Sequence, residues 1–183
     1  MTVAPGELKL LLQQTETLGG FVHQMYFRAA VSLLAPYGIA LNVTDRRLPT
    51  IEFTGMVDPA NTSDVVDVRE KAEKQAPGMN GMLRVIFCRF PSVSQSGEKY
   101  FASTEGGRRW AGSAIVQDFI LINVGKFRPD GSTLIHEMIH ATGLEAHDPD
   151  PTSVFAGGNL RTGTILKPEH ARRLSDSFFG RHR

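Results

Sequence analysis

The N-terminal part of the chain repeats apolar residues at the spacing of a helix. A leucine-rich run fills residues 8–12, and apolar residues recur at intervals of three and four through residues 21–34. This spacing predicts a long N-terminal helix with a break at Gly19 and Gly20. The Pro-Tyr-Gly sequence at residues 36–38 ends the pattern, because proline and glycine interrupt helices.

The next segments alternate between strand and helix patterns. Apolar and polar residues alternate over residues 39–43, which predicts a half-buried strand. Ser63 is a candidate N-cap for a short helix that extends to Lys74. Residues 81–90 form the most apolar strand candidate, so we expect this strand near the centre of a sheet.

The third quarter of the chain predicts a loop followed by strands. Residues 92–107 are polar and contain glycine, as surface loops do. Two strand patterns follow, over residues 114–116 and 119–124, either as one hairpin or as two strands near an edge.

The C-terminal part predicts two helices separated by a loop. The first covers residues 133–142 and ends at Gly143, and the second begins at Pro168 and continues to about residue 179. Residues 144–163 between them are rich in Asp, Pro and Gly. These elements predict an α+β fold with a mixed sheet, and 183 residues are enough for one domain.

Composition excludes several kinds of partner and site. The formal net charge is +1, so no overall field favours nucleic acid or an anionic membrane as partner. No apolar run reaches the ~18 residues of a membrane span, and residues 1–7 lack the pattern of a secretory signal. The compartment therefore stays open: cytoplasmic, exported by another route, or recorded without a signal. The single cysteine, Cys88, excludes an internal disulfide and a multi-cysteine metal site.

The candidate chemistry lies in the helix predicted over residues 133–142. His136, Glu137 and His140 form an HExxH sequence, in which four residues make slightly more than one helical turn. Both imidazoles therefore project from the same face and can bind one metal ion. Glu137 can reach a metal-bound water and accept its proton, which is the arrangement that metal-assisted hydrolysis requires.

A third histidine follows the helix at a distance that suits a third ligand. Gly143 can adopt a left-handed conformation and turn the chain back, which would bring His147 to the metal. Three protein ligands leave a fourth position open, which is typical of catalytic zinc sites.

Residues 136–147 resemble the motif of the metzincin metallopeptidases, HExxHxxGxxH followed by a methionine-containing turn. The resemblance implies a mixed twisted sheet with an N-terminal helix, an active-site helix and a C-terminal helix. It also implies one catalytic domain over residues 1–183, with an upper part of about 1–147 and a small lower part of about 148–183. The chain differs from the motif at two positions. Ala146 stands where the third ligand falls, one residue before His147, and Leu166 stands where the methionine would form the floor of the site.

The resemblance implies a zinc-dependent metalloendopeptidase that acts on protein or peptide substrates, with Zn²⁺ held by His136, His140 and His147. Glu137 would be the general base and then the proton donor to the leaving amine. We expect a monomer. An edge strand above the site would bind peptide by strand addition, with Trp110 as a candidate for the cleft.

Alternatives remain for the third ligand and for the activity. Glu145, Asp148 or Asp150 could replace His147, since carboxylates also bind zinc; the chain would then be another HExxH-type zinc hydrolase. A second alternative is a zinc-binding effector or binding protein without turnover. The remaining histidines are interpreted as structural or solvated: His23, His170 and His182.

Overall fold

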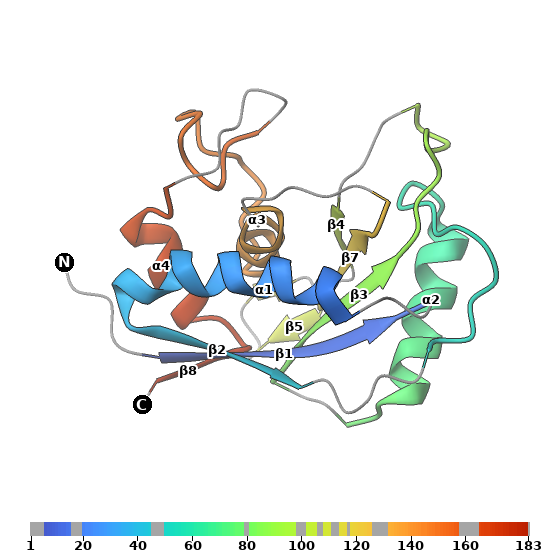
Figure 1. Cartoon of the computed structure of the whole chain (residues 1–183), viewed down its shortest axis with the longest axis horizontal. Coiled ribbons are helices and arrows are strands. Elements are labelled where there is room, and N and C mark those ends of the chain that lie inside the picture. The colour runs from blue at the N-terminus through green and yellow to red at the C-terminus, as the bar shows by residue number, and fades with distance from the viewer. Residues whose placement is uncertain are drawn as a thin grey trace.

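The computed structural model describes most of the chain (Figure 1). The described residues are 6–15, 20–44, 50–78, 81–97, 102–105, 108–110, 114–116, 118–125, 132–157 and 165–182.

The first element is a strand, so the prediction that residues 8–12 begin a helix is wrong. Strand β1 covers Gly6–Gln14, and helix α1 begins at Gly20 and ends at Leu34. Strand β1 is hydrogen-bonded on both sides and its leucines are buried on both faces. A strand buried on both faces has no alternation of polar and apolar residues, and its leucine run resembles part of a helix.

The central sheet is mixed, as predicted. Its strand order is β2-β1-β3-β7-β4. The additional strand β8 pairs with the first residues of β1, Gly6 to Leu8. The pairs β1 with β2, β1 with β3, and β3 with β7 are parallel, whereas β4 and β8 are antiparallel to their neighbours. The bounds are β2 Ile39–Thr44, β3 Leu83–Cys88, β4 Ala102–Glu105, β7 Phe119–Asn123 and β8 Gly180–His182.

Several predicted elements are confirmed, and others differ in detail. The strand at residues 39–43 and the central position of β3 are confirmed. The loop predicted over residues 92–107 contains β4, the edge strand. Of the two later strand patterns, β7 lies inside the sheet, whereas β6 pairs with a separate strand, β5. The bounds are β5 Arg108–Trp110 and β6 Ala114–Val116.

The helices follow the prediction closely, apart from their ends. Helix α2 covers Thr62–Gln75, and its N-cap is Asn61, whose side chain accepts a hydrogen bond from the Ser63 amide; Ser63 itself is not the cap. Helix α3 covers Ser132–Ala141. Helix α4 covers Pro168–Ser175, and a short 3-10 turn covers Ala35–Tyr37. The last helix is shorter than predicted, because the chain turns after Ser175 and enters β8.

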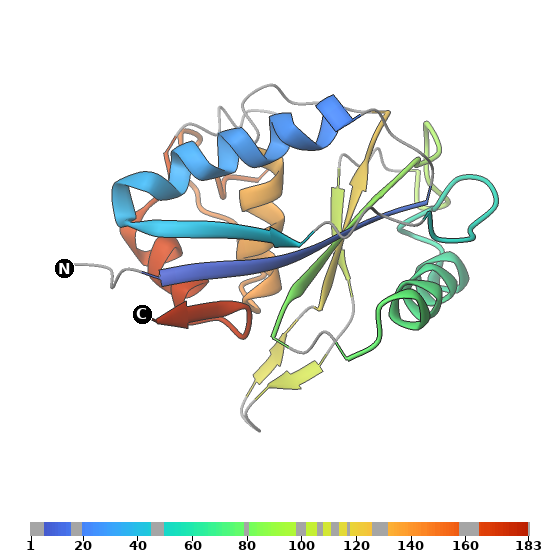
Figure 2. The ribbon, with the colours of Figure 1, turned by 60° about the horizontal axis from the view of Figure 1, so that its bottom comes forward.

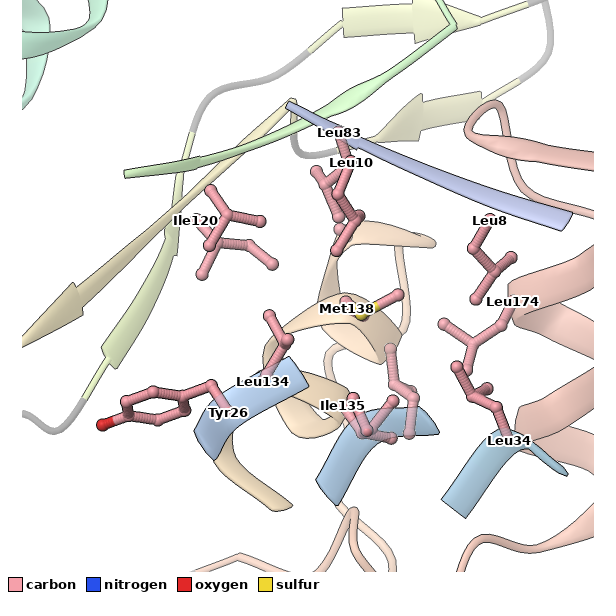
Figure 3. Packing of buried hydrophobic residues seen from close by; sticks show 14 of the residues in the cluster. Leu8, Leu10, Tyr26, Leu34, Leu83, Ile120, Leu134, Ile135, Met138 and Leu174 are labelled. Atoms are coloured by element: carbon pink, nitrogen blue, oxygen red, sulfur yellow. The ribbon is translucent and has the colours of Figure 1, made fainter. Parts of the chain in front are cut away.

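Helices cover both faces of the sheet, and a separate hydrophobic cluster lies on each face. On one face of the sheet, residues of α1, α3 and α4 pack against strand residues such as Leu83 and Ile120 (Figure 3). On the other face, residues of α2 pack against Ile86 and Cys88. Figure 2 shows α2 on the side of the sheet opposite to α1 and α3. Adjacent strand residues point to opposite faces, so β3 contributes to both clusters. Cys88 is a small buried core residue, as the sequence indicated.

Among the residues that the structure describes, no helix is long and apolar enough to cross a membrane.

Gly180 lies close to the C-terminal end of α4. A Cβ atom added at Gly180 would lie 2.1 Å from the Ser175 carbonyl oxygen and 2.8 Å from that of Leu174. We expect Gly180→Ala to lower the free energy of unfolding by about 3 kcal/mol, because two backbone segments must separate to admit the methyl group. Urea denaturation measures this change.

Gly125→Ala is the matched control. Among the described residues, its Cβ would meet only the Asn123 side-chain oxygen, at 3.3 Å, so a small side-chain adjustment suffices. Equal losses of stability in the two variants would contradict the close approach at Gly180.

Candidate metal centre

Helix α3 carries the HExxH residues, and all its residues except His140 are buried. Leu134, Ile135, Met138 and Ile139 are fully buried in the main cluster, which confirms the core role predicted for Met138 and Ile139. The rings of His136 and His140 lie together, with centroids 4.9 Å apart. The core contacts therefore fix the rotation of the helix and, with it, the positions of both imidazoles.

The turn after α3 brings the third histidine back to the first two. Gly143 has φ of 85°, in the left-handed region, and its amide donates to the His140 carbonyl at 2.8 Å. The Nε2 atom of His147 lies 3.2 Å from Nε2 of His136 and 3.2 Å from Nε2 of His140. Among the described residues, these three histidines form the group that could hold a metal ion.

Backbone carbonyls orient two of these imidazoles. Nδ1 of His136 lies 3.0 Å from the Val154 carbonyl oxygen, and Nδ1 of His140 lies 2.8 Å from that of Leu144. A carbonyl oxygen can only accept, so each Nδ1 carries the proton and donates. The lone pair of each neutral ring is then on Nε2, the atom that points to the other two rings. The donor set therefore fits a metal ion.

Two of the three carboxylates proposed as alternative ligands, Asp148 and Asp150, have other partners. Lys167 Nζ donates to both oxygens of Asp148, at 2.9 and 2.7 Å, and lies 3.4 Å from Asp150. Burial raises the pKa of Asp148, but hydrogen bonds from Lys167, the Asp150 amide and Ser153 outweigh it, so the pKa is below its ordinary value. Asp150 accepts from the amide and hydroxyl of Thr152, whereas Glu145 is exposed. None of the three is in the histidine group.

The ring of Phe155 lies against all three histidines. Its centroid is 5.1 Å from that of His136, 4.8 Å from that of His140 and 5.4 Å from that of His147. Sequence reasoning assigned this floor to Leu166 and missed Phe155. Leu166 is buried in the main cluster, and its carbonyl accepts a hydrogen bond from the Tyr37 hydroxyl. The available signal was the apolar run 154–156 inside a polar loop.

Gly157 backs the third imidazole. A Cβ atom at this position would lie 3.1 Å from both Cγ and Nδ1 of His147. This distance is shorter than ordinary van der Waals contact, so a side chain at Gly157 would require the His147 ring to shift by a few tenths of an ångström.

A fourth histidine, His170 of α4, lies behind the aromatic floor. Its ring centroid is 5.2 Å from that of Phe155, and its Nδ1 atom is buried without a hydrogen-bond partner in the described structure. Burial lowers the pKa of His170 below its ordinary value. The charged residues that act on it are Glu169 and Asp148, which raise its pKa, and Lys167 and Arg173, which lower it. The sequence predicted a structural or solvated side chain for His170, and the structure places it in the packed interior.

Glu137 is buried next to β4, at one edge of the sheet. It is 8% exposed, and its Oε2 atom lies 2.5 Å from the Thr104 hydroxyl on β4. No pattern in the sequence indicated this contact. The side chains of His23, His182 and Trp110 lie outside the described residues.

Two solved structures share this architecture. Metalloproteinase-II from Bacteroides fragilis is 14% identical, with a TM-score of 0.61, over 95% of this chain and 53% of its own. Archaemetzincin from Methanopyrus kandleri is 13% identical, with a TM-score of 0.52, over 92% of this chain and 94% of its own. This chain thus spans about half the length of the Bacteroides protein. No family model and no curated protein matches the sequence.

The structural likeness defines the class of the fold. At these identities it supports the fold alone, and that fold is metzincin-like, as the motif predicted. The three converging histidines fit a metallopeptidase fold of this class.

The buried His170 predicts a pH dependence of stability. Its folded pKa is lowered, so below the ordinary value of 6.5 the unfolded chain binds this proton more readily than the folded protein. The free energy of unfolding of the metal-free protein should therefore decrease as the pH falls below 6.5. We expect His170→Gln, which stays neutral, to make this decrease shallower in urea denaturation between pH 7.5 and 5.5. An unchanged pH dependence in the variant would contradict the prediction.

Proposed function

We propose that this protein is a zinc-dependent metalloendopeptidase with His136, His140 and His147 as the metal ligands. The observation that carries the proposal is the convergence of three Nε2 atoms, two of them on rings whose Nδ1 protons are donated to carbonyls. Three neutral imidazoles match the ligand set of catalytic zinc, which leaves a fourth position open. Bound zinc would activate a water molecule and polarise the scissile carbonyl.

Glu137 is proposed as the general base. Its carboxylate would accept the proton of the attacking water and then transfer it to the leaving amine of the cleaved peptide bond. The protein or peptide substrate is inferred from the fold class, because the names of both structural neighbours place them among metalloproteinases or metzincins. We keep the prediction of one catalytic domain that acts as a monomer.

Removal of the base should separate chemistry from metal binding. We expect Glu137→Gln to lower kcat for an internally quenched peptide library by roughly a thousandfold, because no side chain then accepts the proton. Zinc content, measured by atomic absorption, should stay near one ion per chain, because Glu137 is not a ligand.

The wild-type protein with a chelator, then reconstituted with Zn²⁺, is the control. Unchanged cleavage by Glu137→Gln would disprove the proposed mechanism. A wild-type protein that binds zinc but cleaves no peptide would instead favour the zinc-binding effector.

The identity of the third ligand can be tested by metal analysis. We expect His147→Ala to lower zinc affinity at least tenfold, because one of three protein ligands is removed. Asp148→Asn, at the adjacent position, should keep stoichiometric zinc, because Asp148 is bound to Lys167. Competition with a fluorescent zinc chelator measures both affinities. If His147→Ala keeps its zinc affinity and Asp148→Asn loses it, a carboxylate is the third ligand.

A further inference from the structure

Thr104 lies on the edge strand of the sheet, on the face that α3 covers. Strand side chains alternate between faces, so Ala102 and Thr104 of β4 share one face. Ala102 belongs to the same buried cluster as Leu134 and Met138 of α3. Thr104 stands opposite Ile120 of β7, whose side chain is fully buried in that cluster. Thr104 itself is half-buried at this position.

The hydroxyl of Thr104 contacts two oxygen atoms of one residue. Its Oγ1 lies 2.5 Å from Oε2 of Glu137 and 3.1 Å from the backbone carbonyl oxygen of Glu137. Both distances are within hydrogen-bonding range, and both oxygens accept when the side chain is a carboxylate. A threonine hydroxyl has one proton, so it donates to one of them at a time. The shorter contact, to the charged oxygen, is the stronger hydrogen bond.

We propose that Thr104 is a positioning residue for Glu137, which holds the carboxylate of the general base in its working orientation. This inference rests on the proposed function. The carboxyl end of a glutamate turns about broad torsions that packing alone defines poorly. A hydrogen bond from a strand of the sheet to one carboxylate oxygen limits that rotation, and it ties the base to the edge strand.

The same hydroxyl can serve Glu137 throughout the proposed cycle. While Glu137 is a carboxylate, Thr104 donates to Oε2, which leaves Oε1 to accept the proton of the attacking water. Once Oε1 carries that proton, Oε2 still accepts from Thr104, and the proton on Oε1 is available to the leaving amine. The hydrogen bond is kept in both states, because the unprotonated oxygen of a neutral carboxyl group still accepts. A valine at this position would offer no such bond.

The test compares Thr104→Val with Thr104→Ser, using zinc-loaded protein and a quenched peptide substrate. Valine keeps the shape and removes the hydroxyl, so we expect kcat to fall about tenfold to a hundredfold with KM within about threefold. Serine keeps the hydroxyl, so kcat should return to within about threefold of the wild type. Zinc content should match the wild type in both variants, and the melting temperature of the same samples should show that both are folded at the assay temperature. Equal kcat in the wild type and Thr104→Val overturns the proposal.

A second pair keeps the proposal testable if valine prevents folding. Thr104→Ala and Thr104→Ser both lose the methyl group and differ only in the hydroxyl. We expect kcat of the alanine variant to be at least tenfold below that of the serine variant at similar KM, and equal kcat values would overturn the proposal. Failure of the proposed function is distinguishable, because the wild type would then show no chelator-sensitive cleavage. If instead Glu137→Gln is inactive while the alanine and serine variants are equal, only the role of Thr104 fails.

Discussion

The candidate site depends on two hydrogen bonds from imidazole to backbone. A histidine ring can carry its proton on either nitrogen, and only one tautomer leaves Nε2 able to bind a metal. The carbonyls of Val154 and Leu144 select that tautomer in His136 and His140. Both acceptors come from the chain that follows α3, so the ligands of the helix are defined by a loop and not by the helix alone.

The core determines where those hydrogen bonds can form. Helix α3 packs against the sheet and against α1 and α4, and all its described residues except His140 are buried. Phe155 fills the space beneath the three histidine rings and meets His170 of α4 on its other side. Packing by Phe155 and by α4 thus supports the three histidine rings, and the chain needs no methionine beneath them.

Local spacing predicted the parts of the site that belong to one helix and its turn. His136, Glu137 and His140 follow from the period of a helix, and Gly143 from the left-handed turn that ends it. Local periodicity also predicted the four helices, apart from the start of the first, and four of the eight described strands, namely β2, β3, β6 and β7. By contrast, the contacts of Phe155, His170 and Thr104 join elements that only the tertiary fold brings together. The strand β1 was misread because its surroundings, and not its sequence period, decide that it is buried on both faces.

The loop after α3 makes the assembly of the three histidines cooperative. The segment that presents His147 also supplies the Val154 carbonyl for His136, and it closes on itself where the Asp148 amide donates to the Phe155 carbonyl. If this segment opens locally, one imidazole leaves and another loses the partner that fixes its tautomer. Intermediate states with two well-formed ligands are therefore disfavoured, and the histidine centre should assemble and come apart as one unit.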